Sequence, residues 1–264
     1  MDEIIYGTPE QNKWKLESIP QIIYINMDSS QDRQFNLVKE FIDYDIKNFQ
    51  RFRAYTVKDI GTKITRSKAK GIRYFCDVEY ACLSSHIGAI ELFYKEIDSN
   101  YCIICEDDLS FEFVKYWNKS LNEYLSEIPD FELLHLNTSY YTEIDDSKYS
   151  VPEELFVPNE ETSSTLCYII SKLGAKKMLD MIPGDDKLNF SKCTKSKMFC
   201  ADHFINGCEG LKIYSKNLLC WKADNSSVMR TSTNFEHNEL NKIRNAIMEN
   251  LKNRCINCVN CFNE

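Results

Sequence analysis

The chain has 264 residues, a formal net charge of −8 at pH 7 and 43% hydrophobic residues. A chain of this size and composition can bury a sizeable core, which excludes a disordered protein. The negative charge argues against a general nucleic-acid binder, because such proteins need basic side chains that displace phosphate counterions. We find neither the ~18 continuous apolar residues of a membrane span nor a signal-peptide pattern. The sequence therefore predicts a soluble, cytoplasmic protein.

Strand and helix patterns alternate along the first half of the chain. A β-branched and aromatic run predicts a strand over 21–27, followed by helix N-cap formers. Apolar residues at helical spacing then predict a helix. They are Phe35, Val38, Phe41 and Ile42. A second strand is predicted over 51–57 and a longer helix over 81–97.

The second half continues the pattern. The predicted elements are a helix near 121–128, strands over 131–137 and 165–171, a helix over 174–182, short strands over 211–214 and 218–221, and a final amphipathic helix over 238–253. Long polar loops are expected over 138–163 and 183–200. This order predicts one α/β domain over 1–264, with its core over about 21–228 and a C-terminal helix and cysteine-rich tail over 238–264.

Twelve cysteines are many for such a chain. Several lie inside apolar runs, where a free cysteine behaves as a small buried hydrophobe, and without a secretory signal we do not expect a disulfide framework. The spacing of Cys255, Cys258 and Cys261 could supply three thiolates to zinc or to an iron–sulfur cluster. A frayed tail with reactive thiols is the alternative that we favour.

Three consecutive carboxylates, Glu106, Asp107 and Asp108, directly follow the apolar run 101–105. That run is typical of a buried strand in a mainly parallel sheet, and open α/β sheets bind ligands at the carboxyl ends of their strands. Adjacent carboxylates repel one another unless a cation neutralises them, and Mg²⁺ and Mn²⁺ prefer oxygen ligands. We interpret the three acids as a metal site, against the alternative of a solvated acidic turn.

Five segments, in order, resemble glycosyltransferase family 25, which includes lipooligosaccharide and procollagen galactosyltransferases. The segments are IIYINMDSSQDR (22–33), ACLSSHIGAIELF (81–93), IICEDDLSF (103–111), LCYIISKLGAKKML (166–179) and ADHFI (201–205). The resemblance implies a single-domain GT-A fold, which is a Rossmann-like nucleotide-diphospho-sugar transferase fold with a mixed central sheet. It also implies a UDP-sugar donor and a divalent cation, Mn²⁺ or Mg²⁺. Ala81 departs from the family pattern, which usually has glycine there.

The resemblance also implies roles for individual residues. Glu106, Asp107 and Asp108 match the acidic motif that holds the metal, and Asp107 also faces the donor. Asp202 matches the aspartate near the acceptor. The implied donor-side residues are Ile25, Asn26, Arg33, Ser85 and His86. A third metal ligand is expected near the C-terminus, and Asp224 and His237 are both candidates.

The chemistry of sugar transfer agrees with such a site. A metal held by carboxylates stabilises the charge that grows on the leaving diphosphate. If the reaction inverts the anomeric centre, a separate carboxylate must take the acceptor proton, and Asp202 is our candidate, against a role as a helix cap. The predicted reaction moves a hexose (galactose or glucose) from a UDP-sugar to a hydroxyl of a glycan or of a hydroxylysine-type protein acceptor. The alternatives are another Mg²⁺- or Mn²⁺-dependent phosphate enzyme (a nucleotidyltransferase or phosphatase) and an inactive carbohydrate-binding relative.

Overall fold

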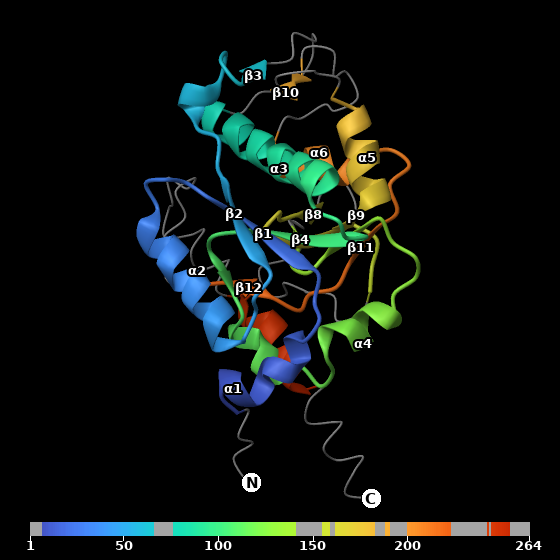
Figure 1. The fold of residues 1–264 in the computed structure, drawn as a ribbon. Helices are drawn as coiled ribbons and strands as arrows, with labels where there is room; N and C mark the ends of the chain where they lie inside the picture. The colour runs from blue at the N-terminus through green and yellow to red at the C-terminus, as the bar shows by residue number, and fades with distance from the viewer. Residues whose placement is uncertain are drawn as a thin grey trace, which may run out of the picture.

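A computed structural model describes residues 7–65, 76–140, 155–158, 162–182, 188–190, 200–222, 242 and 244–253. Its centre is a six-stranded sheet in the order β11-β6-β9-β4-β1-β2 (Figure 1). The strands are β1 (Gln21–Asn26), β2 (Phe49–Arg53), β4 (Tyr101–Glu106), β6 (Leu133–His135), β9 (Cys167–Ser171) and β11 (Ile213–Ser215). The predicted α/β class with a mixed central sheet is confirmed, and it is compatible with a Rossmann-like fold.

Within the six-stranded sheet of the described residues, β9 runs opposite to both of its neighbours. β1 pairs in parallel with both β2 and β4, and β11 pairs in parallel with β6, whereas β9 is antiparallel to β4 and to β6. Three short ribbons accompany the sheet: β3 (Ile64–Thr65) with β10 (Leu188–Asn189), β5 (Leu109–Ser110) with β12 (Cys220–Trp221), and β7 (Ser139–Tyr140) with β8 (Thr162–Ser163).

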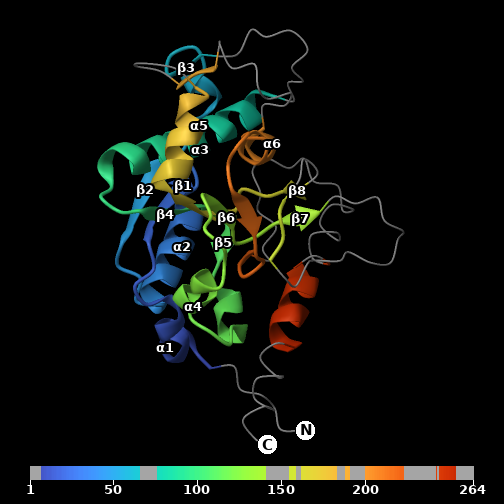
Figure 2. The same ribbon diagram turned by 90° about the vertical axis from the view of Figure 1, so that its right-hand side faces the viewer.

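Helices cover both faces of the sheet. One face carries α3 (Asp77–Glu96), α5 (Lys172–Asp180) and α6 (Ala201–Asn206), and the other carries α1 (Pro9–Asn12), α2 (Gln31–Asp43) and α4 (Leu121–Ser126) (Figures 1 and 2). The short 3₁₀ helices are η1 (Lys13–Leu16), η2 (Val57–Asp59) and η3 (Glu112–Tyr116). Among the described residues, no helix is long and apolar enough to cross a bilayer.

Each strand contributes side chains to two separate apolar cores, because successive side chains of a strand point to opposite faces. Ile22 and Tyr24 join the core under α2 and α4, whereas Ile23 and Ile25 join the core under α3, α5 and α6. Burial on both faces explains why β1 is apolar along almost its whole length rather than alternating with polar residues.

The direction of the chain changes between β1 and β4. The connection from β1 to β2 passes through α2 on one face, and the connection from β2 back to β4 passes through α3 on the other face (Figure 1). The carboxyl ends of β1 and β4 therefore border a topological switch point, which is where open α/β sheets form their ligand-binding crevice.

The predicted apolar face of α2 is partly wrong. Leu37 and Phe41 are buried, whereas Phe35 is 70% exposed and Ile42 is 68% exposed. Residue 35 lies about 200° around the helix from residue 37, so both cannot face the sheet. The spacing predicted a helix correctly but did not identify which of two apolar stripes is buried.

The boundaries of two elements differ from the prediction by more than two residues. The helix α3 begins at Asp77, four residues earlier than expected, because the Glu79 side chain accepts a hydrogen bond from the Cys76 amide at 3.2 Å and caps the first turn. The second strand covers Phe49–Arg53 rather than 51–57, and Val57 begins η2.

Residues 244–253 form the described part of the predicted C-terminal helix. Ile247 and Leu251 are each 1% exposed and belong to the core under α2 and α4. Most of both predicted long loops and the three tail cysteines lie outside the described residues. The extent of a single domain stays a prediction.

Candidate functional site

The three acids lie at the carboxyl end of β4, beside the end of β1. The register pairs Ile25 with Glu106, so Asn26 adjoins Asp107. Both residues lie at the end of the sheet that the carboxyl ends of β1 and β4 form, where the switch point lies. Because β9 is antiparallel to β4, its amino end lies beside the carboxyl end of β4 and brings Thr165 there. The three strands thus place polar side chains at one end of the sheet.

Glu106, the last residue of β4, and Asp107, which follows it, face opposite sides of the sheet. Cys102 and Ile104 face α3, and Glu106, two residues further on, faces α3 as well. Asp107 turns the other way and meets α2. The sequence predicted one cluster of three carboxylates, whereas the structure forms two groups with different partners.

Arg33 of α2 neutralises the two aspartates. Its Nη2 atom lies 2.7 Å from Asp107 Oδ1 and 2.8 Å from Asp108 Oδ2. Asn26 Nδ2 donates to Asp107 Oδ2 at 2.7 Å. One buried oxygen, Asp108 Oδ1, and one buried nitrogen, Arg33 Nε, have no hydrogen-bond partner among the described residues.

Burial raises the pKa of both aspartates, because it disfavours the charged carboxylate. The negative charge of Glu106 adds to this effect and Arg33 opposes it, and the pKa of Asp108 reaches about 7. These carboxylates are costly to ionise with a single guanidinium between them, so a second cation would stabilise the ionised pair.

Glu106 has its own partners. Thr165 Oγ1 donates to Glu106 Oε1 at 2.9 Å, and His86 Nε2 lies 3.4 Å from the same oxygen. The His86 contact does not have hydrogen-bond geometry, and Nε2 has no hydrogen-bond partner among the described residues. Burial raises the pKa of Glu106, but the His86 ring and the Thr165 hydroxyl favour the charged form more strongly, so the net pKa is lowered.

Two of the predicted donor-side residues, Ser85 and Ile25, are buried and have their contacts within the protein. Ser85 is 2% exposed; its hydroxyl donates to Ala81 O and accepts from the Tyr55 amide, each at 2.8 Å. Ile25 is 7% exposed and packs in the core under α3. Their predicted contacts with the donor stay predictions, as do those of Asn26, Arg33 and His86.

Asp202 lies in the first turn of α6, but it does not cap that helix. The N-cap is Cys200, and Asp202 Oδ1 accepts a hydrogen bond from the Ser164 amide at 3.1 Å. The helix-cap alternative is therefore wrong. Burial and the charge of Glu106 raise the pKa of Asp202. Its helix, α6, packs in the core under α3, so Asp202 lies on the same side of the sheet as Glu106. Its role as a base stays a prediction.

Ser164, which binds Asp202 through its amide, has a rare backbone conformation. Its φ is 132°, a region that favours glycine, and its hydroxyl donates to Asn137 Oδ1 at 2.9 Å. Such backbone persists only when neighbouring bonds hold it in place, and it is frequent at binding sites. Here it orients the segment that carries Thr165 to Glu106.

Sequence reasoning missed Thr165, Tyr168 and Cys82 as members of this site. Tyr168 OH lies 3.2 Å from His86 Nδ1. Thr165 has no local sequence signal, because it meets Glu106 through the pairing of β9 with β4. Tyr168 lies in the family-like segment 166–179, but that segment alone does not show that its hydroxyl meets His86 of α3. The four-residue spacing of Cys82 and His86 on one helix was visible in the sequence and could have identified that pair.

Asp224 and His237, the candidates for a third metal ligand, lie outside the described residues. The last described residue before them is Lys222, whose amide donates to the Asp108 carbonyl at 2.9 Å. The ribbon of β5 with β12 thus ties the chain back to the acidic motif.

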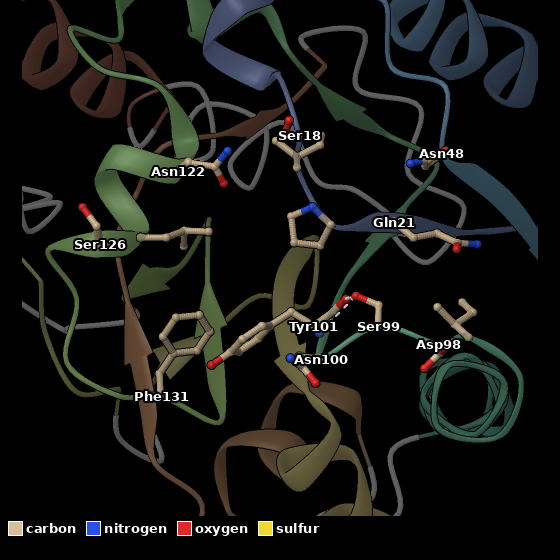
Figure 3. A pocket seen from close by; sticks show the side chains of 14 residues that line it. Ser18, Gln21, Asn48, Asp98, Ser99, Asn100, Tyr101, Asn122, Ser126 and Phe131 are labelled. Carbon is tan, nitrogen blue, oxygen red and sulfur yellow. Dashed lines mark hydrogen bonds between the residues drawn. The ribbon is translucent and has the colours of Figure 1, made fainter.

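A cavity of about 710 Å³ lies at the other end of the sheet, beside the amino ends of β1 and β4. It is lined by residues from the starts of β1 and β4, including Gln21 and Tyr101, and Figure 3 shows Tyr101 beside Phe131, with ring centroids 5.3 Å apart. None of the predicted site residues lines it. We place the functional site at the carboxyl ends of the strands, where the titratable groups gather.

Fold and site together define a mixed α/β protein with a group of acidic side chains at a topological switch point. The model of glycosyltransferase family 25, described as an LPS biosynthesis protein family, matches residues 19–188. The chain belongs to this family, and membership implies transfer of a sugar from a donor to an acceptor. No curated protein matches the chain. The matched region contains the acidic motif, Arg33 and His86 but ends before Asp202.

Proposed function

We propose that the protein transfers a hexose, galactose or glucose, from a UDP-sugar to an acceptor hydroxyl, with Mn²⁺ or Mg²⁺ bound at Asp107 and Asp108 and with a GT-A fold. The acceptor would be a glycan or a hydroxylysine-bearing protein. Family membership supports glycosyl transfer. The observation that carries the proposal is the contact of Arg33 with the buried Asp107 and the partly exposed Asp108 at the topological switch point.

The aspartate pair fits a hard divalent cation. Asp108 Oδ1 is buried and has no partner among the described residues, and a buried anionic oxygen of that kind needs a donor or a cation. When bound there, such an ion stabilises negative charge on the leaving diphosphate. Glu106, directed toward His86 and Thr165, would stay outside the ligand set of this ion.

Arg33 would bind the diphosphate. Its guanidinium presents several N–H donors in a plane, which suits phosphate oxygens, and its Nε has no partner among the described residues. With Asp107 and Asp108 neutralised by a cation, Arg33 would be free to donate hydrogen bonds to the donor substrate. The arginine would therefore hold Asp107 and Asp108 together and then take part in donor binding.

Asp202 would accept the proton of the acceptor hydroxyl. It lies on α6, which packs on the α3 side of the sheet, whereas Asp107 and Asp108 contact Arg33 of α2. Its raised pKa makes it a stronger base once it is ionised. In this proposal Asp107 and Asp108 bind the metal and the donor, and Asp202 acts on the acceptor.

A panel of nucleotide-sugars tests the proposal, with release of nucleotide and transfer of sugar both measured with and without Mn²⁺. UDP-hexose should turn over only with metal, and Asp108→Asn should abolish most turnover. Asp28→Asn is the matched control, because Asp28 also follows β1 at this edge but pairs with Arg51 and Arg53. Undiminished turnover in excess chelator would contradict the metal assignment.

The same panel separates the alternatives. Hydrolysis of nucleotides without any dependence on the sugar would indicate another metal-dependent phosphate enzyme. Absence of both turnover and nucleotide binding would indicate an inactive carbohydrate-binding relative.

A further inference from the structure

Cys82, His86 and Glu106 form a group of metal-ligating side chains on the α3 side of the sheet. One ligand atom from each residue (a thiol sulfur, an imidazole nitrogen and a carboxylate oxygen) lies within 4.8 Å of the others. Cys82 and His86 are four residues apart on α3, so they share one face of the helix. Glu106 meets them from the end of β4.

The His86 ring points its unpartnered nitrogen at this group. The side chain of His86 is 1% exposed, and its Nε2 has no hydrogen-bond partner among the described residues although Glu106 Oε1 lies 3.4 Å away. A buried imidazole nitrogen without a hydrogen bond is costly, and when the ring carries its proton on Nδ1 instead, the Nε2 lone pair faces a carboxylate. A cation bound between the two would satisfy both atoms.

Two of the three ligands are already oriented by a second layer of contacts. Tyr168 OH lies 3.2 Å from His86 Nδ1, and a proton on Nδ1 donated to that hydroxyl leaves the Nε2 lone pair free. Thr165 Oγ1 donates to Glu106 at 2.9 Å. Metal-binding histidines and carboxylates in proteins are held by hydrogen bonds of this kind.

We propose that Cys82, His86 and Glu106 bind a Zn²⁺ ion, through Cys82 Sγ, His86 Nε2 and one Glu106 carboxylate oxygen. On binding, the Cys82 thiol loses its proton to solvent as the zinc–sulfur bond forms. Tetrahedral zinc separates its ligand atoms by roughly 3.3–3.8 Å, so movements of about 1 Å close the site. Glu106 is 31% exposed on its side chain, which leaves a route for the ion and a fourth position for water.

This site differs in kind from the one at Asp107 and Asp108. Thiolate and imidazole ligands favour zinc, whereas an all-carboxylate site favours Mg²⁺ or Mn²⁺. The two groups face different helices, α3 and α2. The zinc site does not depend on the proposed sugar transfer, and its test does not use enzyme activity.

The test is a titration with Co²⁺, a spectroscopic substitute for Zn²⁺, in the full-length chain carrying Cys255→Ser, Cys258→Ser and Cys261→Ser. These changes remove the tail cysteines, whose spacing could bind zinc independently. We expect one equivalent of Co²⁺ to produce a thiolate-to-cobalt charge-transfer band, which Zn²⁺ then abolishes by displacement. No band, or a band that needs a large excess of Co²⁺, would overturn the proposal.

Variants identify the ligands. Cys82→Ser should remove the band and weaken zinc binding roughly 100-fold, and Thr165→Val should weaken zinc binding about 10- to 100-fold by releasing Glu106. Cys76→Ser is the control, because Cys76 is an exposed thiol directly before the same helix. Equal loss of the band in the Cys76 and Cys82 variants would overturn the assignment.

Circular dichroism shows whether each variant folds. If Cys82→Ser does not fold, X-ray absorption of the zinc-loaded parent decides. We expect one sulfur at about 2.3 Å and nitrogen or oxygen neighbours at about 2.0 Å. A zinc environment without sulfur would overturn the assignment, because Cys82 would then not be a ligand.

Discussion

The carboxamide of Asn26 orders the acidic motif at the end of β1. Its nitrogen donates to Asp107 Oδ2 at 2.7 Å and to the Ser30 carbonyl at 3.0 Å, and its oxygen accepts from Arg51 Nε at 2.9 Å. Both amide hydrogens are therefore used within the protein, and the residue is 1% exposed. Asn26 positions Asp107, and any contact with a nucleoside would have to use its remaining acceptor capacity.

Asp202 carries the first prediction at the residue scale. If it is the base, Asp202→Asn should lower kcat by a factor on the order of 10²–10⁴, because the amide cannot accept the acceptor proton. The affinity for UDP and metal should barely change, since Asp202 does not contact the aspartates that hold them. Steady-state kinetics and calorimetric UDP binding measure the two effects.

The structure also gives Asp202 a role in stability. Its bond to the Ser164 amide should make the variant less stable by on the order of 1 kcal/mol, since an amide oxygen accepts more weakly than a carboxylate. Retained turnover together with a lower melting temperature would leave Asp202 only this structural role. A product that keeps the donor's anomeric configuration would also contradict the base assignment.

His135 predicts a pH dependence of stability. The residue is fully buried, its Nε2 lies 2.8 Å from Asn206 Oδ1, and burial lowers its pKa to about 4. The unfolded chain takes up a proton near pH 6.5, whereas the native protein does not until about pH 4. Its contribution to the free energy of unfolding is therefore complete above pH 6.5 and is lost as the pH falls to 4, by on the order of 3 kcal/mol.

His135→Gln keeps an N–H for Asn206 but does not titrate. We expect urea unfolding at pH 4.5 and 7 to show a smaller difference in this variant than in the parent. Comparing two pH values within each protein cancels the general cost of the substitution. An unchanged difference would contradict the pKa assignment.

At the scale of elements, the contact of α5 with β6 depends on a glycine. A Cβ atom on Gly174 would lie 2.4 Å from the Glu132 carbonyl oxygen, which itself accepts from the Ser171 amide at 2.9 Å. That backbone oxygen cannot move without breaking the junction of β9 and α5. Gly174 also belongs to a segment whose pattern resembles the family. The close approach of α5 to the Glu132 carbonyl is the physical reason for a glycine at this position.

Gly174→Ala should therefore lower stability, by roughly 1–3 kcal/mol. The sign is opposite to the usual effect, because alanine in a helix interior is normally about 1 kcal/mol more favourable than glycine. Leu173→Ala, at a position 54% exposed on the same helix, is the control and should change little. Equal or higher stability of the Gly174 variant, measured by denaturant unfolding, would disprove the close contact.

At the scale of the whole molecule, the C-terminal helix is part of the core that holds the α2 side of the sheet. Ile247 and Leu251 pack in the same apolar core as Ile22 and Tyr24 of β1. This helix lies beyond residue 188, where the family match ends. The core of this chain is therefore larger than the region that the family model describes.

Ile247→Ala and Leu251→Ala should each reduce the free energy of unfolding by about 2–5 kcal/mol, as truncations in a packed core do. Asn245→Ala, at an exposed position of the same helix, should stay within about 0.5 kcal/mol. Calorimetry should show one cooperative transition shifted as a whole. A separate transition for the C-terminal helix would contradict its place in the core and the prediction of one domain.

Local sequence determined the order of strands and helices and the position of the acidic motif after a buried strand. Apolar runs, capping residues and periodicity act over a few residues, so β1, β4, α3 and the acids were predictable. The family was also predictable, because its motifs are short contiguous segments. Family membership alone predicted Arg33 and His86 as part of the site.

Tertiary structure decided which partner each acid meets. The direction of β9 brings Thr165 into contact with Glu106. Because α2 and α3 lie on opposite faces of the sheet, Asp107 contacts Arg33 and Glu106 contacts His86. These contacts join residues tens of positions apart, so they depend on strand order and on the face that each crossover helix covers. Neither property is encoded in a local pattern, and for the same reason the sequence could not show that Phe35 is exposed or that Asn26 holds Asp107.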